Sequence, residues 1–121
     1  MDFLEISGFS VPSGRNIEFQ KWVRANSDAL ARSLPEGIEL VGIYAARFTS
    51  QRDAGDYRLI LRLDGAGGLD RFSEAMKQGK DLTRLMGELW DFADVRLGAG
   101  GSDELLKSVL DVMIWADHPE E

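Results

Sequence analysis

The segment that decides the fold is Tyr57–Leu63, with the sequence YRLILRL, in which leucine recurs at every second position. Successive side chains on a β-strand point to opposite faces, so the leucines share one face with the tyrosine, and Arg58, Ile60 and Arg62 share the other. We expect the leucine face to lie in a core beneath helices. The arginine face then has to meet solvent or a partner.

The elements predicted around this strand follow the order strand, helix, strand, strand, helix, strand. Apolar residues at three- and four-residue steps, such as Phe19, Trp22 and Val23, are typical of an amphipathic helix, and Pro35 ends it. The polar, glycine-containing segment 50–56 indicates a hairpin connection. We predict strands at 3–9, 40–49, 57–63 and 109–115, helices at 19–34 and 69–90 with an interruption at Gly79, and a short helical turn at 102–105.

This order predicts one α+β domain that spans residues 1–121. A chain of 121 residues with 44% hydrophobic residues fits a single domain with a substantial core. With right-handed crossovers, the βαββαβ order forms a ferredoxin-like sandwich, in which a four-stranded antiparallel sheet of strand order 4-1-3-2 has both helices on one face. The other face of the sheet is left uncovered.

The uncovered face is expected to be partly apolar, and we therefore expect a second copy of the chain to cover it, giving a homodimer. In the first strand, Leu4, Ile6 and Gly8 are predicted to point toward the helices. In the second strand both alternating sets are mostly apolar, so its orientation stays open. The uncovered face is then expected to carry large apolar side chains (Phe3, Phe9, Ile60, Met113 and Trp115) and charged ones that pair with one another (Glu5, Arg58, Arg62 and Asp111).

The composition excludes several kinds of site. The chain has no cysteine and a single histidine, His118, so disulfides, thiolate chemistry and centres built from histidine or cysteine are not expected. Carboxylates alone can bind magnesium or calcium, but no acidic loop shows the necessary ligand spacing. We therefore expect neither a metal nor a cofactor.

The net charge and the hydropathy of the chain limit the kinds of partner that we expect it to bind. The formal net charge is −7, which repels phosphate backbones, and no cluster of basic and aromatic residues offsets it. Nucleic acid is therefore not an expected partner. The chain starts with acidic Asp2 and Glu5, and no apolar stretch approaches the roughly 20 residues needed to cross a bilayer. These features predict a cytoplasmic protein with no membrane partner.

Three local features, combined with the βαββαβ order, resemble one known superfamily. They are the opening segment FLEI at 3–6, the segment VPSGR at 11–15, and the helix that carries Phe19, Trp22 and Val23. Together they look like the dimeric α/β-barrel superfamily, which includes antibiotic-biosynthesis-monooxygenase-like and NIPSNAP-like domains. The resemblance is one of layout and covers nearly the whole chain. It implies a homodimer whose two sheets close a barrel, with a pocket inside the barrel or between sheet and helices.

The resemblance also implies a kind of chemistry. Monooxygenase-like members oxidise electron-rich aromatic substrates without a cofactor, using pocket residues that are commonly Asn, Trp, Tyr, His and Arg. This chain offers Asn26, Trp22 and Tyr44 for such a pocket and lacks a pocket histidine. We assign no catalytic residue and take six residues as candidate ligand contacts: Trp22, Asn26, Tyr44, Arg58, Arg62 and Trp115.

Most of these candidates also have a structural interpretation; Tyr44 is either a proton donor or simply a strand aromatic, and Trp115 indicates an interface or a pocket. Asn26 interrupts the apolar stripe of the first helix, where its amide either contacts a substrate or is satisfied by backbone or water. Arg58 and Arg62 either bind a carboxylate or phenolate, or form a self-neutralising network with acidic residues. Trp22 lies at helical spacing with other apolar residues, which is typical of a core position.

Three functions are compatible with this pattern. The first is a homodimer that binds an aromatic or amphipathic small molecule. The second is a cofactor-independent monooxygenase for a polyphenol or polyketide-like substrate, in which Asn26 and Trp22 orient the substrate and an arginine stabilises an enolate or phenolate. The third is a structural or interaction domain whose barrel is filled by its own side chains. Whether the chain is an enzyme stays open on sequence alone.

Overall fold

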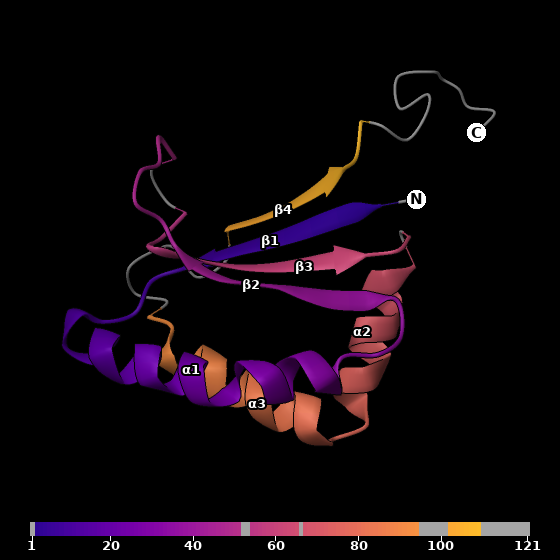
Figure 1. Ribbon diagram of the computed structural model, residues 1–121, viewed down its shortest axis with the longest axis horizontal. Helices are drawn as coiled ribbons and strands as arrows, with labels where there is room; N and C mark the ends of the chain where they lie inside the picture. The colour runs from indigo at the N-terminus through magenta and orange to yellow at the C-terminus, as the bar shows by residue number, and fades with distance from the viewer. Residues whose placement is uncertain (1, 52–53, 66, 95–101, 110–121) are drawn as a thin grey trace.

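The described residues form a four-stranded antiparallel sheet with three α-helices on one side (Figure 1). The structure is a computed structural model that describes residues 2–51, 54–65, 67–94 and 102–109. The strands are β1 (Phe3–Phe9), β2 (Ile38–Ala45), β3 (Tyr57–Leu63) and β4 (Ser102–Lys107). The helices are α1 (Asn16–Ser33), which follows a 3-10 turn at Ser13–Arg15, α2 (Gly68–Lys77) and α3 (Asp81–Phe92).

The strand order in the sheet is β2-β3-β1-β4, which confirms the predicted order 4-1-3-2. The central pair is β1 and β3, and their register places Phe3 opposite Leu63 and Phe9 opposite Tyr57. The βαββαβ fold is therefore ferredoxin-like, with its second helical segment divided in two. Gly79 divides it: its φ of +69° ends α2 in the left-handed conformation that glycine adopts without steric cost.

The core lies between the sheet and the helices and is centred on Phe9. This side chain is fully buried, stacks on Tyr57 with ring centroids 5.6 Å apart, and meets Phe19 and Trp90 edge-on at 5.7 and 5.2 Å. The three leucines of β3 complete the same layer and are at most 4% exposed. The prediction that the leucine face of β3 packs under the helices is thus confirmed.

The predicted orientation of β1 was wrong. Residues paired directly across an antiparallel ladder share a face, so Phe3 and Phe9 lie with Leu63 and Tyr57 on the helix side. Leu4 and Ile6 lie on the other side, opposite Arg62 and Ile60. The aromatic contacts of Phe9 explain this orientation, because a phenylalanine buries more apolar area in the core than the smaller side chains of the alternate face.

The orientation of β2, which the sequence left open, is set by a register shift. Leu40 pairs with Leu61 but Gly42 pairs with Ile60, so Val41 is an extra residue in the ladder. Before the shift Leu40 faces the helices; after it, Ile43 and Ala45 do, because they pair with Leu59 and Tyr57. Neither of the two simple alternating sets of this strand therefore describes it.

The fourth strand of the described sheet begins earlier in the chain than the predicted last strand. The structure pairs Ser102–Lys107 with β1, so the helical turn predicted at 102–105 is instead the strand β4. Val109, the first residue of the predicted strand, lies in a turn, and 110–115 fall outside the described residues. Backbone pairing along the free edge of β1 decides the position, since Leu105 and Leu106 remain 46% and 45% exposed.

Candidate functional site

One hollow among the described residues lies between the first half of α1 and the strand β2, and we call it the α1–β2 pocket. Its volume is about 460 Å³. Its apolar walls are formed by Ile17, Phe19, Val23, Ile43 and Ala45, and its polar groups by Asn16, Gln20, Arg24 and Tyr57. Ligand pockets commonly have this composition, in which apolar surface is combined with a few oriented polar groups.

Local sequence features explain how these side chains meet. Asn16, Gln20 and Val23 lie three or four residues apart and therefore share one side of α1. After the register shift in β2, Ile43 and Ala45 point toward this side of the helix. Because β2 is an edge strand, the pocket opens beside the sheet rather than within the core.

The polar pair of the pocket joins residues that are 41 positions apart. The Tyr57 hydroxyl donates a hydrogen bond of 2.6 Å to Asn16 Oδ1, and the Asn16 amide donates to the Ser13 carbonyl at 3.3 Å. Burial, together with the nearby Asp56 carboxylate, raises the pKa of Tyr57 above its ordinary value. Tyr57 is therefore a neutral phenol at physiological pH, and its proton is already directed to Asn16.

Two of the six predicted contacts, Trp22 and Asn26, lie on α1 on the helix side of the sheet. The Trp22 indole donates to Glu88 Oε1 on α3 at 2.8 Å, and the Asn26 amide donates to the Trp22 carbonyl at 3.0 Å. Both polar groups thus have partners within the fold. Neither residue lines the α1–β2 pocket.

Tyr44, Arg58 and Arg62 lie on the uncovered face, and the structure brings the first two together as a cross-strand pair. Arg58 Nη1 donates to three backbone carbonyls, those of Ala54, Gly55 and Tyr57. Arg62 lies further along the strand and pairs with Glu39 at 2.9 Å and with Asp2 at 3.6 Å. The sixth predicted contact, Trp115, falls outside the described residues.

The charged network expected on the uncovered face takes a different form. Glu5 lies on the helix side of the sheet, opposite Leu61, so it does not pair with Arg58 or Arg62. Asp111 falls outside the described residues. Burial and the charge of Asp103 raise the pKa of Glu5 above its ordinary value.

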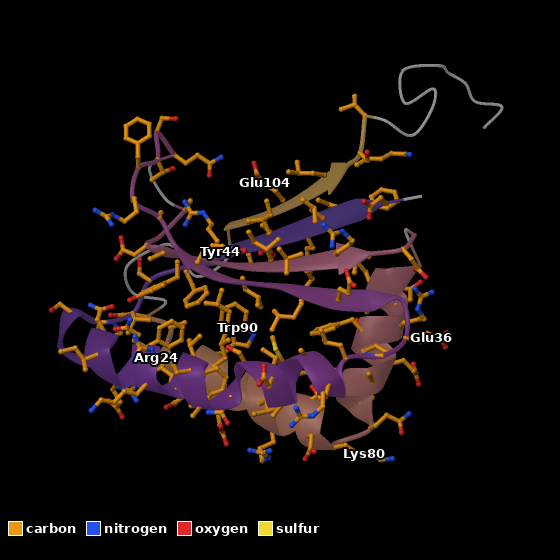
Figure 2. The ribbon with its side chains drawn as sticks, viewed as in Figure 1. Arg24, Glu36, Tyr44, Lys80, Trp90 and Glu104 are labelled. Carbon is orange, nitrogen blue, oxygen red and sulfur yellow. The ribbon has the colours of Figure 1, made fainter. Side chains whose placement is uncertain are left out.

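A second hollow lies on the uncovered face, beneath the connection between β2 and β3. Its volume is about 730 Å³, and Ile6, Ile60 and Tyr44 contribute to its lining. The Tyr44 ring lies against Gly42, where a Cβ atom would approach the ring carbon Cε1 to 2.8 Å. Figure 2 shows Tyr44 and Glu104, which also lines this hollow, near the same end of the sheet. This hollow is the more open of the two.

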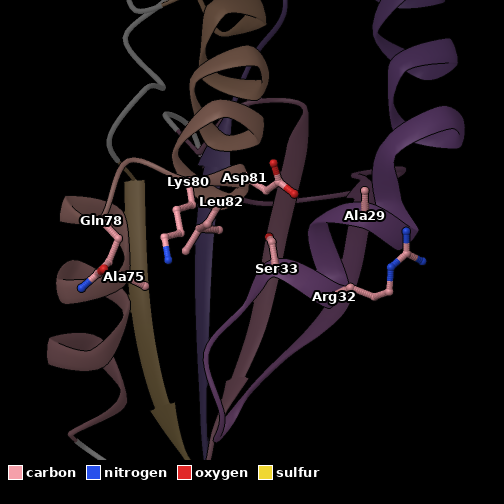
Figure 3. Close-up of a pocket in the computed structure, with 8 residues that line it drawn as sticks. All are labelled: Ala29, Arg32, Ser33, Ala75, Gln78, Lys80, Asp81 and Leu82. Atoms are coloured by element: carbon pink, nitrogen blue, oxygen red, sulfur yellow. The ribbon is translucent and has the colours of Figure 1, made fainter.

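A third hollow lies between the end of α1 and the turn that joins α2 to α3. It has a volume of about 650 Å³, and its lining includes the exposed Arg32, Lys80 and Asp81 and the buried Leu82. Figure 3 shows the charged ends of Arg32 and Lys80 pointing away from each other. Because its polar groups do not converge, this hollow is a weaker candidate for a ligand site.

Neither a cluster of metal-binding side chains nor a helix that could span a membrane occurs within the described residues. No group of three or more histidine, cysteine, aspartate or glutamate side chains is arranged to hold a metal ion there. Among the helices of these same residues, none has the length and apolar character needed to span a bilayer.

The residues of the α1–β2 pocket were not among the predicted contacts, and only part of the signal lay in the sequence. Phe19 and Val23 belonged to the apolar stripe of the first helix, but Asn16 lay before the predicted helix start. Tyr57 was assigned to the helix-facing side of its strand, which is correct. Its contact with Asn16 depends on tertiary packing and has no local signature.

Solved structures of low sequence identity share this fold. A NIPSNAP family protein of unknown function from Agrobacterium tumefaciens matches with a TM-score of 0.59 and 16% identity, over 88% of this chain and 87% of that one. A conserved protein from Methanosarcina mazei matches with a TM-score of 0.52 and 14% identity, over 87% and 88%. The heme-degrader MhuD from Mycobacterium tuberculosis, solved with two hemes in its active site, matches with a TM-score of 0.51 and 18% identity, over 92% and 99%.

These likenesses define the class of fold. It is the ferredoxin-like βαββαβ fold, which the NIPSNAP family structure and MhuD share, and the predicted resemblance is confirmed at the level of the fold. No family model matches the sequence, and a search of curated proteins found no match. At identities of 14–18% the structural likeness shows the fold and nothing finer.

Proposed function

We propose that this chain is a small-molecule-binding protein and that an aromatic or amphipathic ligand occupies the α1–β2 pocket. The observation that carries the proposal is the construction of the pocket, in which apolar walls enclose about 460 Å³ beside the hydrogen-bonded pair of Tyr57 and Asn16. A volume of this size lies in the usual range for small-molecule sites. The two hemes bound by MhuD support the proposal, because they are amphipathic aromatic ligands held by a protein of the same fold.

A binding experiment with a neutral aromatic probe tests this proposal. The probe is 2-naphthol, and its fluorescence is followed as the purified protein is added. We expect saturable binding by the natural protein and its loss in Ala45→Phe, because the new ring fills the pocket from an exposed strand position that tolerates aromatic residues. Native mass spectrometry of the same preparation reports any ligand that is retained through purification.

A matched variant controls for nonspecific effects of the added ring. Ala25→Phe places the same ring on an exposed position of α1 that lines none of the three hollows described above, and it should bind 2-naphthol as the natural protein does. If Ala45→Phe binds as tightly as Ala25→Phe, the ligand is not in this pocket. If the natural protein shows no saturable binding, the proposal itself is wrong.

We propose further that two copies pair through the uncovered face of the sheet. The face carries Leu4, Ile6 and Ile60 on adjacent strands, together with Leu106 and Tyr44, which are 45% and 50% exposed. Several large, partly exposed apolar side chains on one sheet face are typical of a surface that another protein covers. Sedimentation at micromolar concentration should therefore report a dimer.

A charge placed in the middle of the uncovered face should separate the copies. Ile60→Lys puts a cation among Ile6 and the two arginines of β3, so we expect it to sediment as a monomer at micromolar concentration. Ala25→Lys, on the exposed surface of α1, should leave the dimer unchanged. A natural protein that is monomeric at this concentration, or an Ile60→Lys variant that stays dimeric, would contradict pairing through this face.

A further inference from the structure

The arginines of the described residues fall into two groups. Five of them have partners: Arg15, Arg62, Arg71 and Arg84 form ion pairs, and Arg58 donates to backbone carbonyls. The other three have neither a hydrogen bond nor an ion pair within the described part of the chain; they are Arg24, Arg32 and Arg47. Unpaired cations are noteworthy in a chain with a net charge of −7, where carboxylates outnumber them.

Each of these three arginines lines a different hollow, and the surroundings differ. Arg32 shares its hollow with the carboxylate of Asp81, and Arg47 shares the open hollow of the uncovered face with Glu104. Arg24, labelled on α1 in Figure 2, lines the α1–β2 pocket, whose lining contains no aspartate or glutamate. Arg24 is therefore a cation beside an apolar pocket with no lining carboxylate to neutralise it.

The other polar group of this pocket, the Tyr57 hydroxyl, favours a hydrogen-bond donor rather than an anion. The Tyr57 hydroxyl donates its one hydrogen bond to Asn16, so its oxygen can only accept in any further hydrogen bond. Asp56 lies close enough to influence Tyr57 electrostatically, which disfavours a second negative charge there. This end of the pocket suits a donor, such as a hydroxyl group, rather than an anion.

The two polar positions are also well separated. Asn16 and Arg24 are eight residues apart on α1, which corresponds to about 12 Å along the helix axis. Val23 and Ile43 provide apolar surface for the body of a ligand in the same pocket. A flat or elongated molecule with different polar groups at its two ends matches this arrangement.

We infer that the α1–β2 pocket selects an amphipathic organic monoanion whose carboxylate pairs with Arg24 and whose opposite end donates a hydrogen bond to the Tyr57 oxygen. This inference rests on the proposed function and adds the class of ligand. Arginine presents a fork of donors that matches a carboxylate, so Arg24 is the residue that distinguishes an anion from a neutral analogue. Gln20, one turn earlier on α1, offers an additional amide donor at the same side.

The test compares two naphthalene probes on three arginine variants. 6-Hydroxy-2-naphthoate has a carboxylate and a hydroxyl at opposite ends, whereas 2-naphthol has the hydroxyl alone. We expect Arg24→Gln to weaken binding of 6-hydroxy-2-naphthoate about tenfold or more, and to change that of 2-naphthol by less than about twofold. Arg32→Gln and Arg47→Gln remove equally unpaired charges from the other hollows and should leave both affinities unchanged.

Salt dependence provides a second measurement. A carboxylate paired with an exposed guanidinium is screened by added salt, so the affinity of the natural protein for 6-hydroxy-2-naphthoate should fall with ionic strength more steeply than that of Arg24→Gln. The inference is overturned if Arg24→Gln behaves like Arg32→Gln and Arg47→Gln toward the carboxylate. If 2-naphthol binding is nevertheless lost in Ala45→Phe, the proposed function stands and only the ligand class is wrong. If neither probe binds the natural protein, the proposed function and this inference are both wrong.

Discussion

Leu59 and Leu61, on the helix side of β3, are 3% and 4% exposed, whereas Ile60 between them is only partly buried on the other side. The two faces of the sheet thus differ although the same strand forms both. The helix side is completed by α1, α2 and α3, and its aromatic cluster around Phe9 is closed. The uncovered face carries apolar residues of similar size, and no helix of the described chain covers them (Figure 1).

If two copies pair as proposed, the two faces of the sheet are stabilised in different ways. Burial of apolar surface contributes roughly 25 cal/mol per Å², and the helix side obtains it when the chain folds. On the uncovered face Ile6 and Ile60 would gain further burial in the proposed dimer. Substitutions at Ile60 and Leu61, which are neighbours on β3, therefore compare the stability contributed by the two faces.

The largest effect is expected when Leu61 and Ile60 are each shortened to alanine and the losses of stability are compared. Leu61→Ala creates a cavity in the closed core and should lower the free energy of unfolding by about 2–5 kcal/mol at any protein concentration. Ile60→Ala should cost less at concentrations where the protein is monomeric, and its cost should grow with concentration as the proposed dimer forms. Urea unfolding at two protein concentrations measures both. Equal, concentration-independent losses would show that both faces are completed within one chain.

The sequence predicted the helix side well where one pattern dominated. In β3 the leucines recur at every second position, and its bounds and orientation were predicted correctly. In β1, the sequence FLEISGF offers apolar residues to both faces, so alternation alone does not orient it. The aromatic contacts of Phe9 with Phe19 and Trp90 orient the strand, and they join residues far apart in the chain.

The candidate site was less predictable for the same reason. The register shift at Val41 turns Ile43 and Ala45 toward α1, and a rule of strict alternation cannot include such a shift. The pairing of Tyr57 with Asn16 likewise depends on how the elements pack. Tyr44, Arg58 and Arg62 were correctly assigned to neighbouring strands, yet they lie on the other face from the α1–β2 pocket.

A smaller effect is expected from a substitution where the β2–β3 connection, which borders the uncovered face, packs against the end of β1. Gly55, at the end of the β2–β3 connection, has a φ of +88°, and a Cβ atom there would lie 2.5 Å from the carbonyl carbon and oxygen of Phe9. Gly55→Ala should therefore lower the free energy of unfolding by about 1–3 kcal/mol. Thermal unfolding followed by circular dichroism measures this loss.

The matched control for this substitution is Gly65→Ala. A Cβ atom at Gly65 meets no atom within 4 Å, so this variant should remain within about 0.5 kcal/mol of the natural protein. If Gly55→Ala is as stable as Gly65→Ala, the connection is not held against the end of β1. The β2–β3 connection would then not be held in a fixed position beside Tyr44 on the uncovered face.

The smallest effect concerns Glu5, the one carboxylate of β1, which lies on the helix side near Asp103 of β4. Burial and then the charge of Asp103 raise the pKa of Glu5 above its ordinary value of 4.5, so the folded protein binds this proton more tightly than the unfolded chain. The free energy of unfolding should consequently fall as the pH rises from 4.5 through the folded pKa.

Glu5→Gln removes this titration, since glutamine has no proton to lose. Relative to the natural protein, the variant should be more stable at pH 7, and the advantage should disappear as the pH falls below 4.5. Urea unfolding at a series of pH values, with the exposed Glu74→Gln as control, measures the difference. A natural protein that gains stability relative to Glu5→Gln as the pH rises would mean that the Glu5 carboxylate is stabilised in the fold, and that the helix side accommodates charge as readily as the uncovered face does.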